Sequence, residues 1–193
     1  MLAPVVAAGV LLLIHRRRLV AATPLRALWL VLLVLLATVL ASGIQAGTVV
    51  SDSLVNRVLA VVVLAAAIAF VRMNWNQQSR LVRSGVLLTA AGAAGNALAS
   101  LVYGFMPVLA ASARWLGSDL QPGDRPDPQY VAAHASQLPA LLLGDVLPVP
   151  GLDAVISIGD LLLAPGCAIL LAAVLAPLFE ALPVPHVSKE VNP

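Results

Sequence analysis

Charged residues are scarce in this chain of 193 residues. Lys, Arg, Asp and Glu together make up 10% of it, whereas soluble domains carry about 25%. Hydrophobic residues reach 61%. A water-soluble domain of this size cannot hide so much apolar surface from solvent. The composition therefore excludes an ordinary soluble protein and predicts a single polytopic membrane domain over residues 1–193.

Cysteine and histidine are also rare. The single cysteine, Cys167, lies inside an apolar segment, which excludes an intrachain disulfide and any redox or metal motif that needs two cysteines. The histidines are scattered without the spacing of metal ligands: His15, His134 and His186. We therefore predict no metal and no cofactor.

Aromatic residues make up only 4% of the chain, and the basic residues are not gathered with them on a polar face of the kind that binds nucleic acid. The formal net charge of +2 is small, and the basic residues sit beside apolar runs. In that position they orient a membrane protein. Nucleic acid is therefore not an expected partner.

Long apolar runs are what the chain has in abundance, and several approach or exceed the ~18 residues that mark a membrane span. The first is short and is followed by its basic residues, the reverse of the order in a signal peptide, so we expect a retained helix. The predicted fold class is all-α, an integral membrane bundle of about five transmembrane helices with a long outer loop. The predicted spans are 2–16, 24–43, 53–72, 84–103 and 157–179, and the outer loop is 104–153.

The outer loop contains a stretch rich in Pro, Gly and Asp at 121–128. A connection of this length is uncommon unless it is functional or disordered. Residues 107–116 are predicted as a short interfacial helix, with Trp115 at the level of the lipid headgroups. Residues 138–147 are apolar but too short to span, and we expect them to be re-entrant or to lie on the membrane surface.

The basic residues are distributed unequally between the two sides of this bundle. Three lie on the side of the long loop, and eight lie on the other side: Arg16, Arg17, Arg18, Arg26, Arg72, Arg80, Arg83 and Lys189. The richer side is cytoplasmic by the positive-inside rule. We expect a multi-pass protein of the bacterial cytoplasmic membrane, with the N-terminus and long loop outside and the C-terminus in the cytoplasm.

Ser157 and Asp160 stand at the start of the last predicted span. A small hydroxyl followed three residues later by an acid, directly before an apolar run, is the pattern of a capping box. Such a box would satisfy backbone amides at the helix start. The alternative is that Asp160, at the membrane edge, binds a cation or exchanges a proton.

A second pattern runs along the fourth predicted span, 84–103. Small or polar residues recur there every four positions, ending just beyond it: Gly92, Asn96, Ser100 and Gly104. Thr89 and Tyr103 lie close to this stripe. It is typical of close helix packing, with Asn96 hydrogen-bonded across the interface. The alternative is that the stripe lines a pocket open to the outer face.

The run from Leu143 to Pro150 combines a glycine, an acid and two prolines, which predicts a rigid turn stabilised by Asp145. Asp145 and Asp160 could also form a site with two carboxylates. Ser157, His134 and these aspartates could be arranged as in a hydrolase, although no spacing requires it. We expect no catalytic residues, and an enzyme is the less favoured interpretation.

Three ordered motifs resemble one family. They are Gly104-Phe105-Met106-Pro107-Val108, the run Leu143-Gly144-Asp145-Val146-Leu147-Pro148-Val149-Pro150, and Ile156-Ser157-Ile158-Gly159-Asp160-Leu161-Leu162-Leu163. They are similar to those of a bacterial membrane family known as the domain of unknown function number fifty-three seventeen. Where that family has Asn-Gly-Gly before Met-Pro, this chain has Tyr103-Gly104-Phe105. The resemblance implies an architecture and a cluster of site residues without implying a reaction.

These patterns together predict a binding site at the outer face. Its candidate residues are Asn96, Tyr103, Met106, Pro107, Asp145, Ser157 and Asp160. We expect a non-enzymatic module that sits among membrane lipids and binds a partner protein, a lipid or a small ligand. A small transporter or proton-coupled carrier is the alternative, weakened by the absence of an acid or base between Ser84 and Gly104 and of inverted repeats.

Overall fold

The structure is a computed structural model of the chain. It describes residues 26, 29–30, 33–34, 36–37, 40, 52–76, 79–125, 130–134 and 142–180. The first predicted span, 2–16, lies outside the described residues. The second, 24–43, is described at eight positions, of which all but Arg26 are helical.

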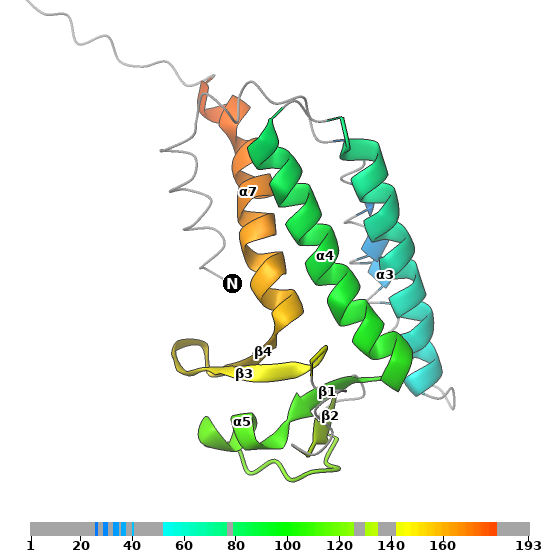
Figure 1. Cartoon of the computed structure of the whole chain (residues 1–193), viewed down its shortest axis with the longest axis vertical. Helices are drawn as coiled ribbons and strands as arrows, with labels where there is room; N and C mark the ends of the chain where they lie inside the picture. Colours follow the sequence, from blue (N-terminus) through cyan, green and yellow to red (C-terminus); the bar gives the residue numbers. More distant parts are fainter. Residues whose placement is uncertain are drawn as a thin grey trace, which may run out of the picture.

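Three long helices lie side by side (Figure 1): α3 (Asp52–Asn74), α4 (Arg80–Tyr103) and α7 (Ile158–Glu180). Each is apolar enough to cross a membrane, α7 over Ile158–Ala176. A helix of 23 residues is about 35 Å long, enough for a hydrocarbon core of about 30 Å. The three helices are compatible with a multi-pass membrane protein, and they match the predicted spans 53–72, 84–103 and 157–179 within a few residues.

Local signals place the ends of α4. Ser79 is the N-cap, and its hydroxyl accepts a hydrogen bond from the amide of Val82. Gly104 ends the helix in the left-handed conformation, with φ of 77°, which a residue without Cβ adopts at little cost. The start of α3 packs against this glycine: a Cβ there would collide with Ser53, and the Asn56 side chain donates to the Gly104 carbonyl over 2.9 Å.

The apolar core of the bundle lies toward the end away from Gly104 and the sheet. It consists of residues from α3, α4, α7 and the partly described segment 24–43, all under 9% exposed: Leu30, Ala66, Phe70, Val82, Val86, Leu170, Ala172 and Ala176. At the same end Asn74 is 1% exposed. Its side chain accepts from the Arg26 amide over 2.8 Å and donates to the Arg26 carbonyl over 2.9 Å.

The prediction of an all-α fold is wrong for the outer loop, which folds into a small sheet below the helices (Figure 1). Its elements are β1 (Met106–Leu109), α5 (Ala110–Trp115), β2 (Tyr130–Ala133), β3 (Asp145–Val149), the 3-10 turn η2 (Pro150–Leu152) and β4 (Ala154–Ser157). The strand order is β2-β1-β3-β4, with β1 parallel to β2 and β3, and β4 antiparallel to β3.

Two local predictions change with the sheet. The segment 107–116, expected to be one interfacial helix, is strand β1 followed by the short helix α5. The expected turn at Asp145 is instead the start of strand β3. Both strands contain a proline, Pro107 and Pro148, and are four or five residues long. The alternation that normally indicates a strand is therefore too short and too interrupted to recognise.

Candidate functional site

The start of α7 is closed by a reciprocal capping box. The Asp160 amide donates to the Ser157 hydroxyl over 2.9 Å, and the Asp160 carboxylate accepts from the Ser157 amide over 2.9 Å. Ser157 is both the last residue of β4 and the residue before the helix, so its backbone is extended where an N-cap requires it. The capping interpretation of the sequence is confirmed by these bonds.

Asn96 on α4 joins the box to the neighbouring helix. Its amide donates to the second carboxylate oxygen of Asp160 over 2.8 Å. The Ser157 hydroxyl lies 2.8 Å from the Asn96 carbonyl oxygen and 2.9 Å from Asp160 Oδ2. A hydroxyl has one hydrogen, so it is shared between these two acceptors. The network fastens β4, α7 and α4 to one another at the sheet end of the bundle.

Small residues allow α4 and α7 to approach closely around this network. A Cβ on Gly159 would collide with the Asn96 side chain, and one on Gly92 would collide with the Gly159 carbonyl oxygen. Gly92 and Asn96 thus lie at the contact between α4 and α7, as the packing interpretation of the stripe expects.

One face of the sheet looks toward the helices. Met106 and Val108 are two residues apart and therefore share a face of β1. Tyr130 pairs with Met106, Asp145 with Val108, and Ser157 with Asp145, so these residues lie on the same face. Ser157 bonds Asn96 of α4, which shows that this face points to the bundle.

Asp145 occupies a different environment from Asp160. It is 8% exposed, no described residue donates a hydrogen bond to its side chain, and its carboxylate oxygens are not fully enclosed. Burial, together with the negative charge of nearby Asp160, raises the pKa of the Asp145 carboxyl from 3.8 to about 7. A perturbed acid beside a cavity is a candidate functional group.

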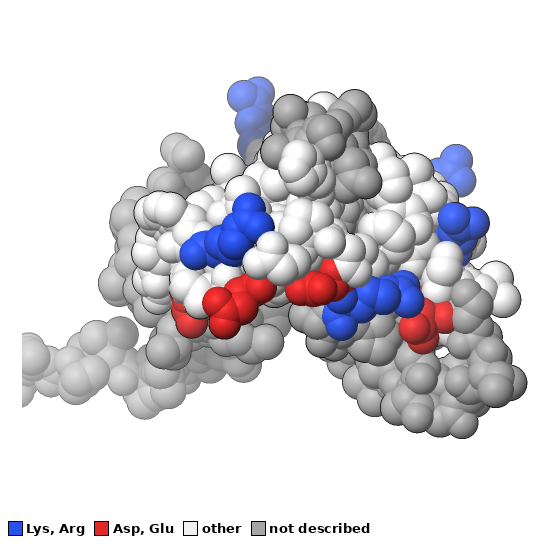
Figure 2. Space-filling model, turned by 90° about the horizontal axis from the view of Figure 1, so that it is seen from below, with Lys and Arg blue, Asp and Glu red and all other residues white. Residues whose placement is uncertain are grey.

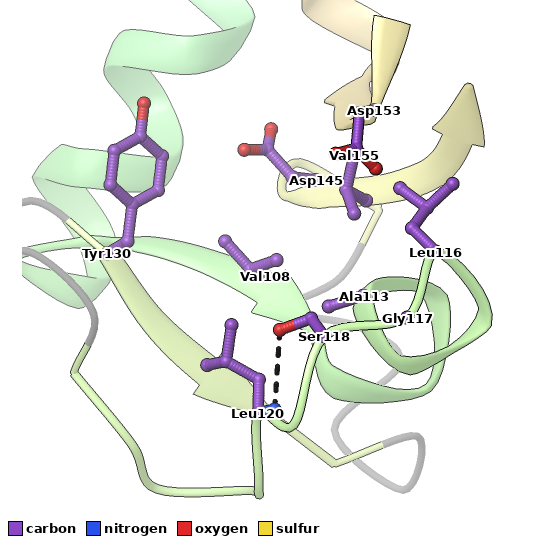
Figure 3. A pocket seen from close by; sticks show the side chains of 10 residues that line it. All are labelled: Val108, Ala113, Leu116, Gly117, Ser118, Leu120, Tyr130, Asp145, Asp153 and Val155. Atoms are coloured by element: carbon purple, nitrogen blue, oxygen red, sulfur yellow. Dashed lines mark hydrogen bonds between the residues drawn. The ribbon is translucent and has the colours of Figure 1, made fainter. Parts of the chain in front are cut away.

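A cavity of about 420 Å³ opens between the sheet, α5 and the segment after it (Figure 3). Val108, Leu116, Leu120 and Val155 supply apolar walls. Its polar groups come from different elements: Ser118, Tyr130, Asp145 and Asp153. Figure 3 shows the Tyr130 ring and the Asp145 carboxylate on the same side, with Val108 between them. We call this space the cap cavity.

A second cavity of about 250 Å³ lies between α3 and α4, on the bundle side of the sheet. Asn56, Asn96 and Ser100 give it polar groups, and Met106 lies against it. Tyr130 lines both this space and the cap cavity. The polar stripe of α4 therefore serves packing at Gly92 and lines a cavity at Ser100.

The structure brings most of the predicted site residues together. Asn96, Ser157 and Asp160 form one hydrogen-bonded network. Asp145 of β3 pairs with Ser157 of the neighbouring strand β4. Met106 lines the second cavity. The role of each in binding stays a prediction.

Pro107 and Tyr103 lie apart from the cap cavity. Pro107 is fully buried, and its carbonyl lies so close to Gly144 that a Cβ there would collide with it. Tyr103 ends α4, and its ring packs against Phe105 with centroids 6.2 Å apart. Neither residue lines the cap cavity or the second cavity. The structure gives both residues packing contacts.

Sequence reasoning missed Tyr130, Asp153 and Asn56. Tyr130 follows the Pro-rich stretch in a strand of four residues and has no local signal. Asp153 can be identified as a cavity residue only from its place in the fold. It is a turn residue between η2 and β4 in the left-handed conformation, with φ of 49°. Asn56 had a signal, because a buried asparagine in an apolar span requires a partner.

No curated protein and no solved structure matches the chain. A family model described as "Family of unknown function (DUF5317)" matches residues 22–172, which include the helices α3 and α4, the whole sheet and most of α7. The match covers far more than half of the chain, and it is the family that the three sequence motifs resemble. The chain therefore belongs to the DUF5317 family.

Proposed function

We propose that this protein is a multi-pass protein of a bacterial cytoplasmic membrane that binds a small ligand in the cap cavity on the outer face. The observation that carries the proposal is Asp145, which is 8% exposed: its carboxylate oxygens open to the cap cavity, and the described residues supply them with no hydrogen-bond donor. Buried polar groups are normally paired. A ligand that supplies a donor compensates the cost of burying this acid.

The charge distribution supports an outward-facing sheet. Arg26, Arg72, Arg80 and Arg83 lie at the end of the bundle away from the sheet. Asp119, Asp124 and Asp153 lie exposed at the sheet end, where Figure 2 shows acidic groups spread across the surface among a few basic ones. Basic residues favour the cytoplasmic side. We therefore place the cap cavity outside, the N-terminus outside and the C-terminus in the cytoplasm.

A carrier is supported less well. Transport requires a path from the Asn96 network to the opposite side of the membrane. In the described part of the chain, the region beyond Gly92 is occupied by the apolar cluster that includes Phe70, Val82 and Val86, all buried. Such a cluster favours a closed bundle with its ligand held at one end.

Hydrolysis is also supported less well. The Ser157 side chain is 0% exposed, and its hydroxyl contacts Asn96 and Asp160. A nucleophile needs access to its substrate and a base oriented toward it. The cap of α7 accounts for the placement of this serine without catalysis.

The test is to fill the cap cavity. We expect Val155→Phe to block it, because Val155 stands in its wall. Val61→Phe is the matched control: Val61 is 54% exposed on α3 and lines neither cavity. A library of small amines, alcohols, carboxylates and sugars is screened by thermal shift against the protein in nanodiscs. Compounds that stabilise the wild type and Val61→Phe but not Val155→Phe support the proposal. Equal stabilisation of all three, or of none, contradicts it.

A further inference from the structure

We propose that the ligand of the cap cavity is an organic monocation, a primary ammonium group on a compact apolar body, and that the ammonium pairs with Asp145. This inference rests on the proposed function and names the chemical class of its ligand. Three observations support it: the different hydrogen bonding of Asp145 and Asp160, the negative charge of the cavity wall, and the apolar surface opposite Asp145.

Asp145 and Asp160 differ in the hydrogen bonds that their carboxylates accept. Both carboxylate oxygens of Asp160 accept hydrogen bonds, from the Ser157 amide and from Asn96. Asp145 is 8% exposed and, within the described part of the chain, accepts none through its side chain, whose oxygens open to the cap cavity. An isolated carboxylate is costly to bury unless a partner or a proton compensates it. An ammonium group offers three donors and a positive charge at once.

The ionisable groups around Asp145 are all acids. The ionisable groups that face Asp145 are Tyr130 from β2, Asp153 from the turn before β4 and Asp160 from α7. Among the described residues that line the cap cavity there is no Lys, Arg or His. Arg114, on the neighbouring helix α5, is exposed and donates to the Gln121 side chain. This environment repels an anion and attracts a cation.

The walls of the cap cavity suit an organic cation better than a metal ion. A calcium ion takes six to eight oxygen ligands, as a rule, and magnesium demands an octahedral set. Within the described residues, no three side chains of His, Cys, Asp or Glu gather closely enough to hold a metal. Val108, Leu116, Leu120 and Val155 instead offer apolar contact on the other walls. The volume of about 420 Å³ is in the range of pockets for small organic molecules.

The test uses three probes of matched shape: phenethylamine as the cation, 2-phenylethanol as the neutral analogue and 3-phenylpropionate as the anion. Binding is measured by equilibrium dialysis at pH 8 to full-length protein in phosphatidylcholine nanodiscs, with empty nanodiscs subtracted. We expect the cation to bind at least about tenfold more tightly than either analogue. MgCl₂ and CaCl₂ are added separately and are not expected to displace it.

Two variants test the role of Asp145. Asp145→Asn should weaken phenethylamine binding by about tenfold or more while leaving 2-phenylethanol unchanged. Asp119→Asn is the control, because it removes an exposed charge from the same end of the molecule without touching the cap cavity. It should bind the cation like wild type. The comparison of three probes on wild type does not depend on whether either variant folds.

The pH dependence provides a second measurement. With the pKa of Asp145 at about 7, most of the carboxyl is protonated at pH 6 and most is ionised at pH 8. Phenethylamine remains an ammonium ion over this range, as a lysine side chain does. Its affinity for wild type should therefore rise by up to about tenfold from pH 6 to pH 8. The affinity for Asp145→Asn should not follow this rise.

Different results would contradict the cationic class of the ligand and the proposed binding function. If the alcohol binds as tightly as the amine and Val155→Phe abolishes both, the cavity binds a ligand but the cationic class is wrong. If Mg²⁺ or Ca²⁺ displaces the amine and binds by itself, the site is a metal site and the inference is overturned. If none of the three probes binds, the inference is overturned, and the library screen decides the proposed function separately.

Discussion

At the scale of single residues, two aspartates near one end of the bundle have opposite roles. Asp160 is the acid of a capping box and its carboxylate is satisfied by protein donors. Asp145 is buried in a cavity wall, and burial beside Asp160 raises its pKa to about 7. The difference follows from hydrogen bonding and desolvation, since the two side chains are chemically identical.

The raised pKa of Asp145 predicts how stability depends on pH. Below about pH 4 the carboxyl is protonated in both the folded and the unfolded chain. Between about pH 4 and pH 7 the unfolded chain loses this proton while the folded chain keeps it, so the free energy of unfolding falls as the pH rises. Above pH 7 the full cost of the buried charge is present.

Asp145→Asn removes this cost and keeps the shape. We expect the variant to melt at a higher temperature than wild type at pH 8, by an amount equivalent to roughly a few kcal/mol of unfolding free energy. The advantage should shrink toward pH 5. Melting curves in detergent at the two pH values measure it, with the exposed Asp119→Asn as control. An Asn variant that is less stable than wild type at pH 8 would mean that the ionised carboxylate makes stabilising bonds.

Asp160 allows a test of the cap itself. Asp160→Asn keeps an oxygen that can accept from the Ser157 amide. Its new NH₂ group would then face Asn96, whose amide can turn by 180° to present its oxygen. We expect a loss of about 1 kcal/mol or less for Asn. Asp160→Ala leaves the Ser157 amide and the Asn96 NH₂ without their partner and should cost about 1–3 kcal/mol.

Thermal unfolding of the two purified Asp160 variants beside wild type checks this prediction. Recovery of stability in Asn but not in Ala supports the cap. Variants that both melt like wild type would show that the carboxylate contributes nothing to the start of α7. The cation or proton interpretation of Asp160 would then become the better one.

At the scale of elements, the contact between α4 and α7 depends on glycine at chosen positions. A Cβ added to Gly92 would collide with the Gly159 carbonyl oxygen and lie 2.7 Å from the amide nitrogen of Leu163. These are backbone atoms of α7, so the whole helix must move to relieve the contact. Gly95, one turn further along, has room: its Cβ would lie 3.8 Å from the Cα of Gly159.

We therefore expect Gly92→Ala to destabilise the bundle by about 1–3 kcal/mol, the usual cost of overpacking. Gly95→Ala should be neutral or stabilise by up to about 1 kcal/mol, because alanine favours the helix. Both are measured by thermal unfolding in detergent. Equal melting temperatures for the two variants would show that α7 adjusts freely and that the close contact is unimportant.

The sheet depends on pairing between distant segments of the chain. Its strands are short, and β1 pairs in parallel with strands that lie well over a dozen residues away along the chain. Parallel strands need such long connections. Each strand becomes stable only when its partner arrives, so local propensity gives little indication of it. The Asp52–Arg125 ion pair, at 3.8 Å, adds a partly exposed link between the sheet region and α3.

At the scale of the whole molecule, the arrangement of charge predicts its orientation in the membrane. Asp119 is exposed at the sheet end, and Asn76 is exposed just after α3, at the opposite end. In a Cys167→Ala background, Asp119→Cys should react with a membrane-impermeant maleimide on intact cells. Asn76→Cys should react only after the membrane is opened. The reverse pattern would overturn the orientation derived from the basic residues.

Much of the architecture was determined by the sequence alone. Apolar runs of sufficient length predicted α3, α4 and α7, since the bilayer sets the length that such a helix needs. The Ser157 and Asp160 pair predicted the capping box because both partners lie within one turn. The motifs around Met106, Asp145 and Ser157 led to the family. All of these signals are local in the chain or follow from its composition.

Only the tertiary structure decided the sheet, the cap cavity and the contrast between the two aspartates. Asp145 and Asp160 look alike in the sequence, each preceded by glycine. Asp145 acquires its raised pKa because β3 is placed between β1 and β4, which buries the side chain near Asp160. Tyr130 enters the site because β2 pairs with β1 from across the Pro-rich stretch. Burial and charge proximity depend on where distant segments meet, and no local pattern encodes that.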